Sequence, residues 1–397
     1  MSNKKFYKNN LFINIGLILI TFFLIFLSLF IIDYVIGLNQ KEPTWQSDGL
    51  IFTPYTVAQY HSNEFIYTAK INSIGIRDHE ISLNKSKDTI RIIAIGDSFT
   101  YGWGHNIEDS WVKILERKLN ENRTNVEIFN LGMPGAGPVQ YSKIAEKSVP
   151  LLKPDLVIIA ILQGDDIMQL ESLPPPDQPL ISEIKNTSKM LFPHIFSSMK
   201  RGLEYQISQT WKNQAEEFQK TLTSEEQVRL ENLDPEVKKA YIEGQLNPGV
   251  VRIAIKQPTY FLETMDVQSD FTKNLTLKLT NELTKIKSVC EANGAKVLVI
   301  SIPERTYVNH VGLIDTKRVG YTVDEKMLVS NAPDDVIKNS CLDANITFIS
   351  VMDEFRKNDS RLYFEFDGHF NSEGSKLFAE NINRNFERIN WKSSILK

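Results

Sequence analysis

The chain has 397 residues, of which 42% are hydrophobic and 24% charged, with a formal net charge of −4. This composition is typical of a folded protein with a buried core. The weak negative charge, without a basic stripe, excludes an ordinary nucleic-acid-binding surface, so we expect no nucleic-acid partner. Two cysteines, Cys290 and Cys341, exclude a disulfide-stapled small scaffold and a multi-cysteine zinc site.

An uncharged apolar run lies near the N-terminus, at residues 11–32. A helix of this length spans roughly 33 Å, about one membrane core. Lys4, Lys5 and Lys8 precede the run and Asp33 follows it, which predicts a cytoplasmic N-terminus and a periplasmic or extracellular remainder. A cleaved signal peptide would have a shorter apolar region and a small-residue cleavage site. A buried helix of a soluble core is the other alternative. We favour an uncleaved single-pass anchor.

The rest of the chain divides by composition and pattern. A Pro-rich stretch at 174–179 and charged helical segments at 212–232 and 235–244 interrupt the alternation of strands and helices. We interpret this part as an inserted helical lid over one edge of the sheet. The expected organisation is a cytoplasmic tail at 1–10, a transmembrane anchor at 11–35, a stalk at 36–63 and a catalytic domain at 64–390 with a helical insertion at 167–257.

Short apolar segments and segments with helical spacing alternate through the expected catalytic domain. Residues 64–76 suggest a short strand pair. The longer strands are predicted at 89–95, 126–130, 155–162, 296–302 and 347–351. The helices are predicted at 110–121, 139–151, 262–292 and 334–341. This alternation predicts an α/β sandwich with a parallel sheet and right-handed crossovers.

Candidate catalytic residues follow the predicted strands, where open parallel sheets bind their ligands. Ser98 follows the first long strand, and Asp367 and His369 lie in a C-terminal loop. A serine needs a base to become nucleophilic, and an imidazole can supply it near neutral pH. Asp367 can hold the imidazole tautomer. The backbone N–H groups of Gly135 and Ser98 can face an oxyanion. Each feature alone is common, and their order along the chain gives them weight.

Four sequence blocks resemble those of the SGNH (GDSL-like) hydrolases. They are GDSFTYGWG at 96–104, NLGMPGAG at 130–137, QGDD at 163–166 and DGHFNSEG at 367–374. The resemblance covers roughly residues 70–165 and 262–385. It implies a flavodoxin-like three-layer α/β/α sandwich, and ester hydrolysis or acyl transfer without a cofactor or a metal.

The resemblance also implies roles for single residues. Ser98 would be the nucleophile, His369 the base with Asp367 beside it, and Gly135 an oxyanion donor. Asp165 stands where the family pattern has an oxyanion-binding Asn. Either Asp165 is held protonated by burial and by Asp166, which we favour, or it points away and another donor fills the oxyanion hole. The last block spaces Asp and His two residues apart, where the family often has three.

The sequence thus predicts an esterase or O-acyltransferase that forms an acyl-enzyme on Ser98. Several family members with an N-terminal anchor act on acylated polysaccharides, which favours an acylated carbohydrate or lipid as substrate. The first alternative is a catalytically weak glycan-binding or scaffold member of a polysaccharide modification or export system. The second is a metal-dependent phosphoesterase, with ligands from Asp97, Asp165, Asp166 and His369. An α/β-hydrolase is disfavoured, because the Ser98 turn lacks the second Gly of the nucleophile elbow.

The sequence leaves four points open. Hydrolysis and acyl transfer share an acyl-enzyme, so the sequence does not separate them. The acyl group, the oligomeric state and any membrane protein partner are also open. Cys290 and Cys341 are predicted near helix ends of one sheet, and we favour two buried thiols over a bridge.

Overall fold

The computed structural model describes residues 16–17, 19–33, 35, 49–121, 125–171, 205–389 and 391–394. Residues 16–17, 19–33 and 35 are helical, and most of their apolar side chains are exposed. Among the described residues, no helix is both long and apolar enough to cross a membrane. The anchor expected at 11–35 lies partly outside the described residues.

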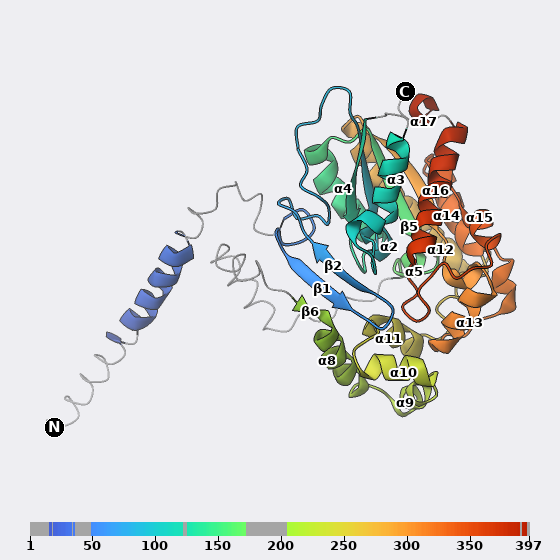
Figure 1. Ribbon diagram of the computed structural model, residues 1–397, viewed down its shortest axis with the longest axis horizontal. Coiled ribbons are helices and arrows are strands. Elements are labelled where there is room, and N and C mark those ends of the chain that lie inside the picture. The colour runs from blue at the N-terminus through green and yellow to red at the C-terminus, as the bar shows by residue number, and fades with distance from the viewer. Residues whose placement is uncertain are drawn as a thin grey trace.

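A five-stranded parallel sheet forms the centre of the protein (Figure 1). Its spatial order is β4-β3-β5-β7-β8, the 2-1-3-4-5 order of flavodoxin-like sheets. The strands are almost continuously apolar because helices cover both faces of the sheet. Their bounds are β3 Ile90–Gly96, β4 Val126–Gly132, β5 Leu156–Leu162, β7 Lys296–Ile302 and β8 Thr347–Ile349. All five predicted strands are present, and the last ends two residues earlier than expected.

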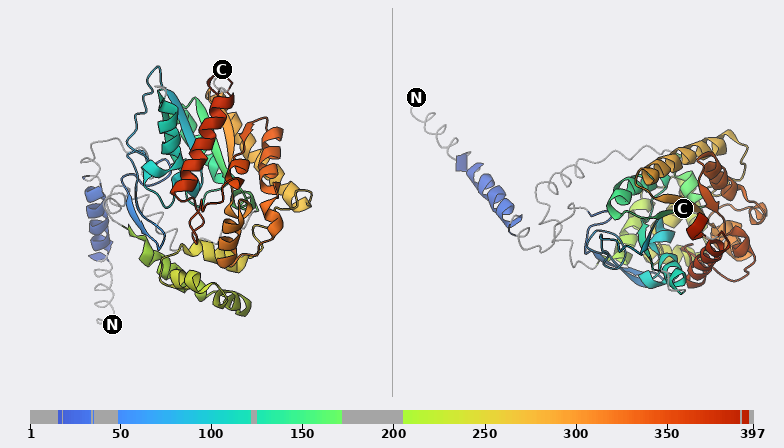
Figure 2. Two further views of the ribbon diagram at one scale, coloured as in Figure 1. Left: turned by 45° about the vertical axis from the view of Figure 1, so that its right-hand side comes forward. Right: turned by 90° about the horizontal axis from the view of Figure 1, so that it is seen from above.

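Helices pack on both faces of this sheet (Figure 2). On one face, α3 (Trp111–Asn120) packs against α16 (Ser372–Ile389). On the other, α12 (Asp270–Ala292) contacts both α4 (Pro138–Leu152) and α14 (Ala332–Asp343). The fold is therefore the expected α/β/α sandwich. The shorter helical elements nearby are η1 Ile107–Asp109, η2 Arg305–Tyr307, α13 His310–Arg318, η3 Glu325–Leu328, α15 Met352–Arg356 and α17 Trp391–Ser394.

Helix α12 begins later than the predicted range of 262–292. Its N-cap is Ser269, whose hydroxyl accepts a hydrogen bond from the Thr272 N–H at 3.1 Å. Residues 259–268 form turns before this cap. The apolar spacing that suggested a longer helix therefore belongs partly to a turn segment packed on the core.

A smaller sheet, with order β2-β1-β6, lies beside the central one. β1 (Val57–His61) and β2 (Ile66–Lys70) form an antiparallel hairpin, and β6 (Tyr205–Gln206) pairs parallel to β1. The Ser62 hydroxyl accepts hydrogen bonds from the N–H groups of Glu64 and Phe65, which places the hairpin turn there. The strand pair expected within 64–76 thus begins at residue 57. The stretch predicted as a stalk contributes a strand to the folded body.

Residues 205–256 form four short helices below the end of the central sheet where α2 and α5 lie (Figure 1). The predicted helical segment 212–232 is two helices, because Thr223 and Glu226 form a capping box that starts a new one. Residues 172–204 of the expected insertion lie outside the described residues. The four helices are α8 Ile207–Gln219, α9 Ser224–Glu231, α10 Pro235–Ile242 and α11 Pro248–Lys256.

Cys290 in α12 and Cys341 in α14 are both free and buried. Burial raises the pKa of each thiol to about 12. Both residues therefore act as small apolar core side chains, as the favoured interpretation of the sequence expected.

Candidate active site

Ser98 lies at the carboxyl end of the central sheet, where β3 gives way to the short helix α2 (Ser98–Tyr101). Asp97 caps this helix, because its carboxylate accepts a hydrogen bond from the Phe99 N–H at 2.9 Å. As the first residue of the helix, Ser98 has an N–H without an intrahelical acceptor. The Ser98 side chain is only partly buried. Its hydroxyl and its N–H are therefore both available to a ligand.

His369 reaches Ser98 from the C-terminal loop. Its Nε2 lies 2.6 Å from the Ser98 Oγ, within hydrogen-bond distance. Its Nδ1 bonds to the carboxylate of Asp367, two residues earlier. Gly368 between them has a φ of 86°, a left-handed turn that lets both neighbouring side chains face the same way. The structure thus brings together the three predicted residues, and the two-residue spacing is compatible with their contact.

Opposing effects act on the pKa of His369. Burial alone would lower it, but the charge and hydrogen bond of Asp367 outweigh burial, with further help from Asp97 and Asp165. The net pKa of His369 lies above its usual value of 6.5. Neutral imidazole, the form that accepts a proton from Ser98, therefore predominates only above this raised pKa.

Two aromatic rings hold His369 in place. The centroid of Phe99 lies 4.8 Å from that of His369, and Trp103 lies 5.6 Å away. The Trp103 indole N–H also donates to the second carboxylate oxygen of Asp367 at 3.2 Å. Asp367 is itself buried. Trp103 thus helps to position both His369 and Asp367. The sequence analysis assigned no role to this residue.

Glu64, at the tip of the β1–β2 hairpin, holds the backbone of the Asp367 loop. Its carboxylate accepts the Asp367 N–H at 2.8 Å and the Phe366 N–H at 3.2 Å. Burial, followed by the charge of Asp367, raises the pKa of Glu64. Sequence reasoning missed this residue, because Glu64 lies about 300 positions from its partners and in no recognisable motif.

Two arginines brace the site from outside. Arg77, 1% exposed, donates to the carbonyl oxygens of Tyr101 at 2.7 Å and Gly102 at 2.8 Å, just after α2. Arg305 donates to the carbonyl oxygen of Glu365 at 2.8 Å, in the loop that carries Asp367. These bonds satisfy carbonyl groups that have no partner in a helix or strand.

The loop after β4, which carries Gly135, is tied to the end of the neighbouring strand β3. The Met133 N–H donates to the Gly96 carbonyl at 2.9 Å, which ties this loop to the end of β3. The Asn130 side chain donates to the Thr100 carbonyl at 2.8 Å and so joins the loop to α2. Gly135 has a φ of 73°, and its own N–H donates to no acceptor among the described residues. The role of the Gly135 N–H as an oxyanion donor therefore stays a prediction.

Asp165, the first residue of α5 (Asp165–Met168), does not offer a donor. Its carboxylate oxygens accept from the Tyr260 hydroxyl at 2.7 Å and from the Gln169 side-chain amide at 2.8 Å. Its backbone N–H donates to the Gln163 carbonyl at 3.1 Å. This arrangement differs from the favoured hypothesis of a protonated Asp165 in the oxyanion hole. These bonds favour the alternative in which Asp165 points away and another donor fills the oxyanion hole.

Asp97, Asp165 and Asp166 gather behind Ser98, with carboxylate oxygens within 4.8 Å of one another. Asp166 accepts hydrogen bonds from the Tyr141 hydroxyl and the Leu162 N–H, both at 2.8 Å. Burial raises the pKa of Asp97 to about 7, although the charge of His369 lowers it in part. Burial, followed by the charges of Asp97 and Asp165, raises the pKa of Asp166 well above its usual value. Buried carboxyls this close do not ionise together readily, because each negative charge opposes the next.

The same cluster contains part of the metal-ligand set that the phosphoesterase alternative required. His369 is directed to Ser98 and Asp367 and not into this cluster. Asp97 Oδ1, both Asp165 oxygens and Asp166 Oδ2 accept hydrogen bonds from protein donors, whereas the buried Asp166 Oδ1 has no partner in the described part of the chain. The arrangement is that of a buried network that supports α2 and α5.

Comparisons with known proteins give one family match. Residues 94–240 match the model of the GDSL-like Lipase/Acylhydrolase family. This segment contains Ser98, Gly135 and Asp165 but ends before Asp367 and His369. No curated protein matches the chain.

Several solved structures are also similar at a low level. An acetylxylan esterase from Geobacillus stearothermophilus has a TM-score of 0.36 and 12% identity, over 76% of this chain and 95% of that one. A lipase/acylhydrolase from Enterococcus faecalis has a TM-score of 0.36 and 14% sequence identity, over 75% of this chain and 96% of that one. A psychrotrophic esterase from Pseudoalteromonas sp. has a TM-score of 0.37 and 11% sequence identity, over 75% of this chain and 97% of that one. With such low scores, these likenesses carry no weight in the argument about function.

Proposed function

We propose that this protein is a serine-dependent esterase or acyltransferase of the GDSL-like family. The observation that carries the proposal is the hydrogen-bonded chain from Ser98 through His369 to Asp367 at the carboxyl end of the sheet. The family-model match over residues 94–240 supports it. No cofactor is needed, because the three side chains supply the nucleophile, the base and the orienting carboxylate.

The reaction begins when Ser98 Oγ attacks the carbonyl carbon of an ester. His369 Nε2 takes the hydroxyl proton, and Asp367 stabilises the imidazolium that forms. The tetrahedral oxyanion accepts hydrogen bonds from the N–H groups of Ser98 and Gly135. When it collapses, His369 returns the proton to the leaving alkoxide, and an acyl-enzyme remains on Ser98.

The second half of the reaction decides between hydrolysis and acyl transfer. Neutral His369 deprotonates water or an acceptor hydroxyl, which attacks the acyl group and releases Ser98. Asp165 donates nothing to the oxyanion in this scheme, because its N–H and both carboxylate oxygens have other partners. Two backbone donors suffice for an oxyanion hole in other acyl-transfer sites.

The proposal includes an external location for this chemistry. The uncharged run at 11–32 with lysines before it supports a single-pass anchor with its N-terminus in the cytoplasm. A catalytic body outside the cytoplasmic membrane would meet acylated carbohydrate or lipid. Protease treatment of spheroplasts, whose outer layers are opened, tests this orientation: the body is digested if it lies outside the cytoplasmic membrane and protected if it lies inside.

Purified protein assayed on p-nitrophenyl acetate tests the activity. We expect hydrolysis that survives a metal chelator and disappears in Ser98→Ala. Hydrolysis that the chelator abolishes, and that Ser98→Ala keeps, would favour the metal-dependent alternative. A folded wild-type protein without activity on a panel of aryl and sugar esters would favour the glycan-binding alternative.

A further inference from the structure

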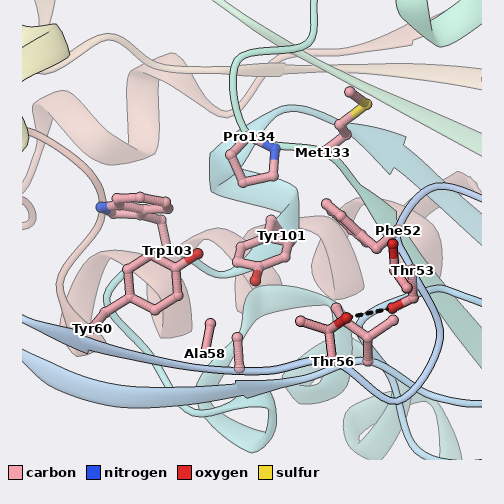
Figure 3. A pocket seen from close by; sticks show the side chains of 11 residues that line it. Phe52, Thr53, Thr56, Ala58, Tyr60, Tyr101, Trp103, Met133 and Pro134 are labelled. Carbon is pink, nitrogen blue, oxygen red and sulfur yellow. Dashed lines mark hydrogen bonds between the residues drawn. The ribbon is translucent and has the colours of Figure 1, made fainter. Parts of the chain in front are cut away.

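A cavity of about 420 Å³ lies between the β1–β2 hairpin and the Ser98 region (Figure 3). Its walls come from parts of the chain that are far apart in sequence. Phe52 and both hairpin strands form one side, and the opposite side comes from the end of α2 and the loop after β4. The cavity therefore exists only because the hairpin packs against the candidate active site.

Three wall residues connect this cavity to the reacting groups. Tyr101 lies one helical turn after Ser98 in α2. Trp103 packs on His369 and donates to Asp367. Pro134 directly precedes the oxyanion donor Gly135. The cavity wall is therefore continuous in the chain with α2 and with the loop of Gly135, and it includes the ring that packs on His369.

The chemistry of the walls selects an apolar ligand. No charged residue lines the cavity, and most of its surface comes from aromatic, aliphatic and proline side chains. The Tyr60 and Tyr101 hydroxyls in the cavity wall are hydrogen-bonded to each other, and two further polar groups of the wall also have partners. The Trp103 indole N–H donates to Asp367, and the Thr56 hydroxyl donates to the Thr53 carbonyl at 2.8 Å. A sugar ring would leave its hydroxyls unpaired here, which is costly.

Small side chains on the two hairpin strands form the floor of the cavity and leave space above it. Ala58 in β1 and Ala69 in β2 are directly opposed in the hairpin register, and both line the cavity. Tyr60, two positions after Ala58, faces the same side and stacks on Tyr67 at 4.6 Å. A pair of alanines between aromatic walls leaves a slot that fits a flexible hydrocarbon chain.

We infer that this cavity binds the acyl chain of the substrate ester, and that the preferred acyl group is a hydrocarbon chain longer than acetyl. The inference rests on the proposed esterase function. When water or an acceptor hydroxyl attacks the acyl carbon, the bond to Ser98 Oγ breaks, and the chain leaves the cavity as part of the free acid or the new ester.

p-Nitrophenyl esters with acetyl, butyryl, octanoyl and lauroyl groups test the inference, because only the acyl part varies. We expect kcat/KM of the wild-type protein to rise from acetate to octanoate. Ala58→Leu, which fills the floor, should lower the octanoate-to-acetate ratio by at least about tenfold. Gln59→Leu is the matched control, because Gln59 lies next in the same strand on the opposite face of the hairpin and does not line the cavity.

The outcomes separate the inference from the proposed function. An Ala58→Leu protein that keeps the wild-type chain-length profile, or a wild-type protein that hydrolyses acetate best, overturns the acyl cavity and leaves the esterase intact. A wild-type protein inactive on all four esters and unlabelled at Ser98 by a fluorophosphonate overturns the function itself. If Ala58→Leu lowers the unfolding temperature, Ala58→Val makes the same comparison with less added volume.

Discussion

The central sheet and the N-terminal hairpin serve the same site in different ways. The sheet positions Ser98 through a continuous buried core, in which Ile92, Ile93 and Ile95 of β3 are 0% exposed. The hairpin joins the site through a separate small aromatic cluster that includes Phe65, Trp103 and Trp211. The sheet supplies the nucleophile, and the hairpin holds the groups that activate it.

This difference indicates which substitutions should affect catalysis and which should affect stability. A large apolar core tolerates small changes at its margin, because its stability is spread over many contacts. Besides the aromatic cluster, the hairpin contacts the site through a few polar contacts, above all the hydrogen bonds that the Glu64 carboxylate accepts from the Phe366 and Asp367 N–H groups. We therefore expect changes in the hairpin to affect catalysis more than folding.

The largest loss of activity is expected from substitution of Ser98 or His369, the residues that react with the substrate. Ser98→Ala and His369→Ala should each lower kcat by about 10⁴-fold or more, and the double variant should be no worse than either. Steady-state kinetics on an aryl ester, with circular dichroism as the folding control, measure this. Losses that multiply in the double variant would mean that the two residues act independently.

Removal of Glu64 tests the contribution of the hairpin. Glu64→Ala should lower kcat by up to about 100-fold with little change in KM, because the Asp367–His369 loop loses its anchor. Glu64→Gln keeps an acceptor oxygen and should restore most of the activity. Glu80→Ala is the control, since Glu80 is exposed and bonds to Ser73, away from the loop. Equal losses in Glu64→Gln and Glu64→Ala would show that the hydrogen bonds are not what matters.

Asp165→Asn should have a smaller effect, visible mainly in the pH profile. The charge of Asp165 helps to raise the pKa of His369, so its removal lowers that pKa. Because neutral His369 is the active base, the acid limb of kcat/KM should move to lower pH. The activity at the optimum should stay equal or rise. An acid limb that moves to higher pH, or a variant as inactive as Ser98→Ala, would contradict this account of Asp165.

The smallest effect is expected in the core. Cys290 and Cys341 are free and buried, so a reducing agent should leave the unfolding temperature unchanged within about 1 °C. Thiol titration after denaturation without a reductant should find two thiols. Fewer than two would mean that a disulfide forms in the native protein.

The central sheet could be predicted from the sequence because its signals are local. The apolar run from Leu156 to Leu162 and the turn at Ser98 follow from neighbouring residues alone. The DGH loop likewise marked His369 as a base. The contacts of Glu64 and the N–H donation from Trp103 join segments far apart in the chain, which no local pattern encodes. The engagement of Asp165 by Tyr260 was hidden for the same reason.

Covalent labelling with a fluorophosphonate tests the central claim, that His369 activates Ser98 as a nucleophile, most directly. Digestion and mass spectrometry of the labelled protein should find a single adduct, on the peptide that contains Ser98. Labelling should be lost in Ser98→Ala and strongly slowed in His369→Ala. An adduct on another residue, or ester hydrolysis by protein that the reagent leaves unlabelled, would contradict the account.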